Sequence, residues 1–143
     1  MSKSATFEND LLKLIFNATA IAGLADNATA SPTATLFLSL HTADPGDAGT
    51  QSTNEVSYTG YARVAVARTT AGWVVTGSSV SPVSSVTFGE MTAGTAQTAV
   101  YASIGTASTG VGKVLYRGAL TPSIAINVGV VPTIRNTSTI TED

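Results

Sequence analysis

The first segment of the chain has apolar residues at helical spacing. They fall at positions i, i+4, i+7 and i+8 and form one stripe: Phe7, Leu11, Leu14 and Ile15. Ser4 or Thr6 can cap the start of this helix. Glu8 and Asp10 lie in its first turns, where the helix dipole favours acidic side chains. We expect the helix to end between residues 17 and 23, with its stripe packed on the body of the same chain or on a partner subunit.

From Pro32 onward the periodicity becomes two-fold. In residues 35–41, Leu36, Leu38 and Leu40 form a clear apolar face. Residues 61–68 alternate again and are followed by a β-rich stretch at 72–76, which predicts a hairpin. Glycine, proline and serine turns separate further expected strands: 80–88, 98–104, 113–120, 124–131 and 133–140. The pattern predicts a mainly β chain, with residues 1–31 as an N-terminal α-helix and linker. Residues 32–143 are expected to form an antiparallel β-sandwich or barrel-like domain.

The composition argues against several classes of partner and location. The 143 residues include no cysteine, only seven basic residues and a net charge of −2, which argues against nucleic acid as a partner. No apolar run is long enough for a membrane span, and the N-terminus lacks the pattern of a signal peptide, so we expect synthesis in the cytoplasm. Charged residues make up only 11%. Either serine and threonine coat a neutral surface, or neighbouring subunits cover it.

The stretch from Leu40 to Val64 holds the only histidine, together with three carboxylates. A metal site built from His41, Asp44, Asp47 and Glu55 competes with a simple loop between strands. Asp-Pro-Gly at 44–46 is strong turn chemistry, and the spacing does not match an EF-hand. We therefore expect a loop, with no metal and no cofactor.

Catalytic patterns are weak. Glu55 lies eight residues before Arg63, and a structural ion pair between them is favoured over chemistry. A Ser-His-Asp triad lacks a Gly-x-Ser-x-Gly elbow, and Glu90 has no second carboxylate nearby to form a glycosidase pair. We expect no enzymatic activity and assign no catalytic residue.

Two further stretches have competing interpretations. The glycine-rich segment 105–112 lacks the Gly-Lys-Ser/Thr ending of a phosphate-binding loop and is expected to be a hairpin loop. Five aromatic residues form either a sugar-stacking platform or parts of a core or interface, and the second is favoured: Tyr58, Tyr61, Trp73, Tyr101 and Tyr116.

One long motif carries a family resemblance. LFLSLHTADPGDAGTQSTNEVSYTGYARVAV, residues 36–66, resembles a family of small structural proteins of tailed-bacteriophage virions. IGTASTGVGKVLYRGALTPSIAINVGVVPTI, residues 104–134, and the ending TSTITED are similar to the closing strands of that family. Members are commonly described as tail-fibre proteins.

The resemblance implies a non-enzymatic virion protein whose partners are the major capsid protein or tail proteins. A compact β domain favours a capsid decoration or cement protein that binds the head surface. The alternative is a tail-fibre or other tail-associated component, with or without binding of host glycans. We expect a homo-oligomer, with a trimer first. No catalytic residue comes with the family. The motif positions are interpreted as residues that shape loops and set strand register: His41, Asp44, Pro45, Gly46, Asn54, Glu55, Gly60, Tyr61 and Arg63.

Overall fold

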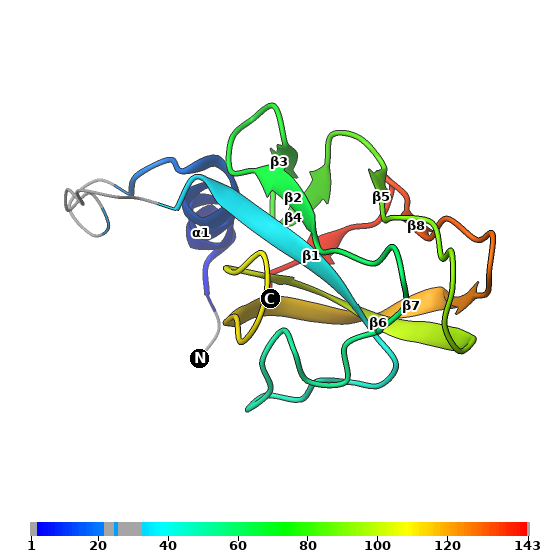
Figure 1. The fold of residues 1–143 in the computed structure, drawn as a ribbon. Helices are drawn as coiled ribbons and strands as arrows, with labels where there is room; N and C mark the ends of the chain where they lie inside the picture. Colours follow the sequence, from blue (N-terminus) through cyan, green and yellow to red (C-terminus); the bar gives the residue numbers. More distant parts are fainter. Residues whose placement is uncertain (1–2, 22–24, 26–32, 143) are drawn as a thin grey trace. The chain divides into compact units, whose positions relative to one another are not determined.

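The computed structural model describes residues 3–21, 25 and 33–142. In this part of the chain the fold is mainly β, with antiparallel sheets and a single N-terminal helix, as predicted (Figure 1). The chain divides into two compact units. The first takes in Met1–Thr35, Val66–Ser85 and Arg135–Asp143, and the second takes in Leu36–Ala65 and Val86–Ile134. The expected boundary between residues 31 and 32 falls outside the described residues and stays a prediction.

The first unit contains the helix α1 (Ala5–Asn17). Ser4 is its N-cap, and the Ser4 hydroxyl accepts a hydrogen bond from the backbone N–H of Phe7 at 3.3 Å. The predicted stripe has the wrong phase, because Phe7 is 39% exposed whereas Leu12 and Phe16 are fully buried. The reason is an aromatic contact: the Phe16 ring lies edge-on to Trp73, with 4.7 Å between centroids. The helix thus packs on strands of its own unit.

Those strands are β3 (Trp73–Thr76), β4 (Ser79–Pro82) and β9 (Ile140–Thr141), which form a three-stranded antiparallel sheet in the order β3-β4-β9. The predicted hairpin between residues 61–68 and 72–76 is wrong, because β3 pairs with β4. Gly77, with φ +59°, supplies the left-handed position that this tight connection needs. The expected strand 80–88 is interrupted after Pro82, and its second part is the separate strand β5 (Val86–Thr87).

The second unit is built around a four-stranded sheet in the order β2-β1-β6-β7. Its strands are β1 (Thr35–His41), β2 (Val64–Ala67), which crosses the division between the units, β6 (Gln97–Gly105) and β7 (Val114–Ile126). β1 has the predicted bounds. β7 covers two expected strands. Its pairing with β6 shifts register between Ala99 and Tyr101 of β6, and this irregularity accommodates the Thr-Pro-Ser segment that was expected to form a turn.

The remaining pair of strands in the second unit is β5 with β8 (Thr133–Ile134). The expected strand 133–140 is therefore also divided, with β8 at its start and β9 at its end. None of the sheets formed by the described residues closes into a barrel, so the barrel alternative is not met.

β1 has an apolar face, as predicted: Leu36, Leu38 and Leu40 are at most 4% exposed. The second half of the opposite face is also buried, although its residues there are polar. Ser39 and His41 are fully buried there, beside Ser103 of β6, which is paired in register with Ser39. The chain that follows β1 covers this polar face, and that cover positions the candidate site.

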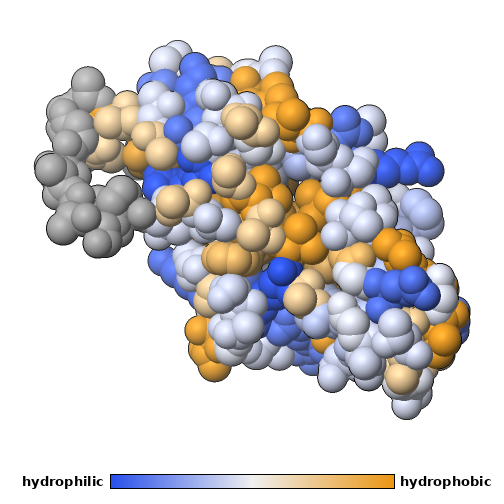
Figure 2. All heavy atoms as spheres, turned by 45° about the horizontal axis from the view of Figure 1, so that its top comes forward, coloured by the Kyte–Doolittle hydropathy of each residue, from blue (hydrophilic) through white to orange (hydrophobic). Residues whose placement is uncertain are grey.

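The surface is poor in charge. Figure 2 shows one face, on which residues of intermediate hydropathy lie among smaller strongly hydrophilic and hydrophobic patches. Exposed hydroxyl residues such as Thr92, Ser108 and Thr109 supply uncharged polar surface. Coverage by neighbouring subunits stays a prediction. In the part of the chain that the structure describes, no helix combines the length and the hydropathy of a membrane span.

Candidate functional site

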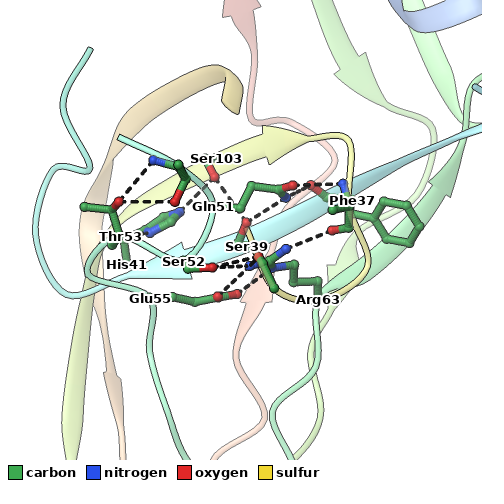
Figure 3. Close-up of polar contacts among 12 residues, drawn as sticks. Phe37, Ser39, His41, Gln51, Ser52, Thr53, Glu55, Arg63 and Ser103 are labelled. Carbon is green, nitrogen blue, oxygen red and sulfur yellow. Dashed lines mark hydrogen bonds and ion pairs between the residues drawn. The ribbon is translucent and has the colours of Figure 1, made fainter. Parts of the chain in front are cut away.

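The four residues of the metal hypothesis are divided among separate interactions. His41 bonds to Thr53 and Ser103, Glu55 bonds to Tyr61 and Arg63, and both aspartates bond to Arg117. Among residues 3–21, 25 and 33–142, no three histidine or acidic side chains gather in a group that could hold a metal ion. The stretch from His41 to Arg63 instead forms a network that fixes loops to the sheet (Figure 3).

His41 lies at the centre of the buried polar face. Its Nδ1 is 2.8 Å from the Thr53 carbonyl oxygen, and its Nε2 is 2.8 Å from the Ser103 hydroxyl. A carbonyl oxygen can only accept, so Nδ1 carries the proton and donates to Thr53. Burial lowers the pKa of His41 below 6.5 and outweighs the opposing effect of the Thr53 carbonyl. The ring is therefore neutral at pH 7, and Nε2 accepts from Ser103.

This assignment orients a chain of buried hydrogen bonds. Because the Ser103 hydroxyl donates to His41, Ser39 donates to Ser103 across 3.1 Å. Ser39 in turn accepts from the side-chain amide of Gln51 at 3.2 Å, and that amide also donates to the Phe37 carbonyl. Each donor in this series of hydrogen bonds thus has an acceptor, as burial requires.

The contact between Ser103 and His41 has the distance of a nucleophile and its base. The other ring nitrogen faces a backbone carbonyl, where a catalytic triad has a carboxylate. Ser103 is 2% exposed and His41 is fully buried, so the hydroxyl does not face solvent in this structure. The arrangement therefore packs two buried side chains against each other.

The predicted ion pair between Glu55 and Arg63 is confirmed. Arg63 donates to both carboxylate oxygens, Nε to Oε1 at 2.8 Å and Nη2 to Oε2 at 2.7 Å. Tyr61 also donates to Glu55 Oε1, and its oxygen accepts the backbone N–H of Leu40. The hydrogen bonds that Arg63 donates to Glu55 raise the pKa of Arg63, and burial raises the pKa of Tyr61. Both side chains thus keep their protons at neutral pH.

The glycine-rich segment is a hairpin loop, as predicted. Gly105 ends β6 and Val114 begins β7, and we call Thr106–Lys113 between them the β6–β7 loop. Gln51 packs against this loop so closely that a Cβ at Gly105 or Gly112 would overlap its carboxamide. These glycines thus make room for a side chain of the protein itself.

The turn at Asp44 also has its predicted chemistry. The Asp44 carboxylate accepts the backbone N–H of Gly46 at 2.9 Å, and Gly46 has φ +76°. Arg117 of β7 bonds to Asp44 at 2.7 Å and to Asp47 at 2.8 Å. The Gly46 N–H, followed by Arg117, lowers the pKa of Asp44. The ion pairs of Arg117 with the two aspartates thus connect the turn to β7, the edge strand of the sheet.

The aromatic residues do not form an exposed platform. Trp73 is 1% exposed beside Phe16, and Tyr58 is 8% exposed. The Tyr58 and Tyr61 rings lie 5.4 Å apart, and Tyr61 stacks on Phe88 at 6.0 Å. Tyr101 and Tyr116 are partly exposed. The structure thus places Trp73 and Tyr58 in the interior.

Several residues of the network were not predicted from the sequence. Ser39 sits on a strand whose alternation indicates a polar face, and that is the only signal for it, whereas no such alternation marks Ser103. Gln51 and Arg117 lie far from their partners along the chain, and nothing in the local pattern marks them.

The comparison with known families agrees with the motif. The model of the family "Podophage GP4 fiber I protein gp80" matches residues 2–141, and no curated protein matches the chain. The description names a fibre protein, so it agrees with the tail-fibre alternative and not with capsid decoration. The chain belongs to the Podophage GP4 fiber I protein gp80 family and is thereby a structural protein of the phage virion.

Proposed function

We propose that the chain is a non-enzymatic component of a phage tail fibre or of a tail-associated assembly, and that it works by binding other proteins of the particle. The family match over residues 2–141 is the observation that carries this proposal. It replaces the capsid decoration hypothesis, which rested on the compact size of the domain.

The internal chemistry supports a structural role. The chain's single histidine, a buried arginine and the carboxylate that pairs with it are all engaged with neighbouring groups. A catalytic group needs access to a reacting atom, whereas these side chains hold backbone segments in place. We expect His41→Gln and Glu55→Gln to change folding stability and not to abolish any turnover.

The test is the position of the chain in the particle. A peptide tag at the C-terminus, labelled with gold in purified phage, is expected to mark the tail or its fibres in electron micrographs. Labels spread over the capsid shell would overturn the proposal in favour of decoration. Untagged particles serve as the control for nonspecific gold.

The oligomeric state is a separate part of the proposal. We expect the purified chain to form a homo-oligomer, with a trimer first, because charge-poor surfaces associate at little desolvation cost. Light scattering after size exclusion measures the mass directly. A monomer at high concentration would contradict this part and leave the position in the particle unaffected.

A further inference from the structure

The β6–β7 loop is held in place by groups that lie outside it. The backbone of Gln51 donates to the Gly112 carbonyl at 2.9 Å, and the Gln51 side chain accepts the N–H of Ala107 at 3.0 Å. The Ser52 hydroxyl donates to the Gly110 carbonyl at 2.7 Å. A loop fixed through its backbone at three separate positions has little freedom left to lose on binding.

Arg63 completes this support. Its Nη1 donates to the Ala107 carbonyl at 3.0 Å and its Nη2 to the Gly110 carbonyl at 2.8 Å. The Arg63 side chain is only 3% exposed, and its charge is balanced by Glu55. Buried ion pairs add little net stability and are better explained by the geometry that they fix. The geometry fixed here is the path of the loop.

The side chains of the loop itself remain exposed. Thr106, Ser108 and Thr109 are exposed, and Val111 is 79% exposed, the highest value among the large exposed hydrophobic residues of the described chain. Residues 105–112 carry no charge, and the one charged residue of the loop is the exposed Lys113 at its end. The loop is thus anchored by its backbone, and between Thr106 and Gly112 it offers an uncharged surface of hydroxyl groups with one apolar side chain.

We infer that the β6–β7 loop is a contact surface through which the chain attaches to another protein of the phage particle. Where it faces residues 106–112, the partner surface is uncharged, with an apolar recess for Val111 and backbone or amide groups that pair with the loop hydroxyls. A preorganised loop suits such a contact, because little conformational entropy is lost when it binds. This inference rests on the proposed function.

The test compares two exposed valines of the same unit. A phage that lacks the gene is complemented with Val111→Asp or with Val128→Asp, whose parent side chain is 66% exposed in the segment that follows β7. Quantitative mass spectrometry of purified particles measures how much of the chain is incorporated. We expect Val111→Asp to lower incorporation at least tenfold and Val128→Asp to change it less than twofold, with both variants as thermostable as the parent.

A second variant tests the anchoring. Arg63→Lys keeps the charge but cannot hold Glu55 and two carbonyls together. We expect faster hydrogen exchange at the Ala107 amide and lower incorporation into particles, while exchange in the interior of β1 stays as slow as in the parent. Ser108→Ala, which removes an exposed hydroxyl without touching the anchor, is the control for exchange.

The outcomes separate this inference from the proposed function. If the parent chain is absent from tails and fibres, the proposed function fails. If the parent is present there and Val111→Asp is incorporated equally well, the loop is not the contact surface. If Val111→Asp instead lowers the oligomeric mass of the purified chain, the loop binds a second copy and the inferred partner is wrong.

Discussion

The two faces of β1 are both buried over its second half, by opposite means. On one face Leu36, Leu38 and Leu40 exclude water, and each contributes through apolar area alone. On the other face Ser39 and His41 are equally inaccessible, and each is buried only because a specific partner meets it. The apolar face tolerates neighbours of many shapes. The polar face requires particular donors and acceptors, so it also fixes where residues 50–55 lie.

The largest effect is expected on the apolar face. Leu40→Ala removes a fully buried side chain and should lower the free energy of unfolding by about 2–5 kcal/mol, because the lost contacts leave a cavity. Urea denaturation followed by tryptophan fluorescence and circular dichroism measures it. Val128→Ala, at an exposed position, is the control and should change the value by less than about 0.5 kcal/mol. Equal effects of the two variants would contradict the assignment of this face.

A smaller loss is expected on the polar face. Ser103→Ala removes one hydroxyl, which leaves His41 Nε2 without a donor and the Ser39 hydroxyl without an acceptor. Such unsatisfied buried groups cost about 1–3 kcal/mol. Ser108→Ala, at an exposed serine, should cost almost nothing. If Ser39→Ala and Ser103→Ala together cost the sum of their separate effects, the two hydroxyls do not act as a chain.

The smallest expected effect is a dependence of the free energy of unfolding on pH, which His41 contributes on the polar face and the leucines do not contribute on the apolar face. Because the pKa of His41 is lower in the folded chain than its ordinary value of 6.5, the unfolded chain binds the proton first as pH falls. The stability that this group contributes is complete above pH 6.5. It is lost as pH falls through the folded pKa, with a slope of at most about 1.4 kcal/mol per pH unit.

The chain has one histidine, so its ring signals in an NMR titration report the folded pKa without ambiguity. His41→Gln should flatten the dependence of stability on pH just below 6.5, while Leu40→Ala should leave its slope unchanged. Asp44 does not interfere, because its pKa lies below 3.8 and its contribution is lost only at more acidic pH. A folded pKa at or above 6.5 would contradict the neutral, buried ring.

The local pattern predicted a good part of the fold. Strict alternation of leucines located β1 with its observed bounds, and Ser4 was one of two expected caps of α1. Local rules also identified the Asp44 turn and the hairpin loop at residues 105–112. Pairing was less predictable. The hairpin after residue 72 closes at Gly77 and not at the preceding turn, and residues 114–126 form one strand despite Pro122.

For the site, the sequence by itself determined the kinds of group present: one histidine, no cysteine, few charges and a motif that identified the family. Only the tertiary structure decided which groups meet. His41 and Ser103 are 62 positions apart, and Arg63 reaches carbonyls more than forty positions away. Periodicity reports which face of a strand is apolar. Hydrogen-bond partners depend on how distant segments cross, and that information is not contained in any local window of the chain.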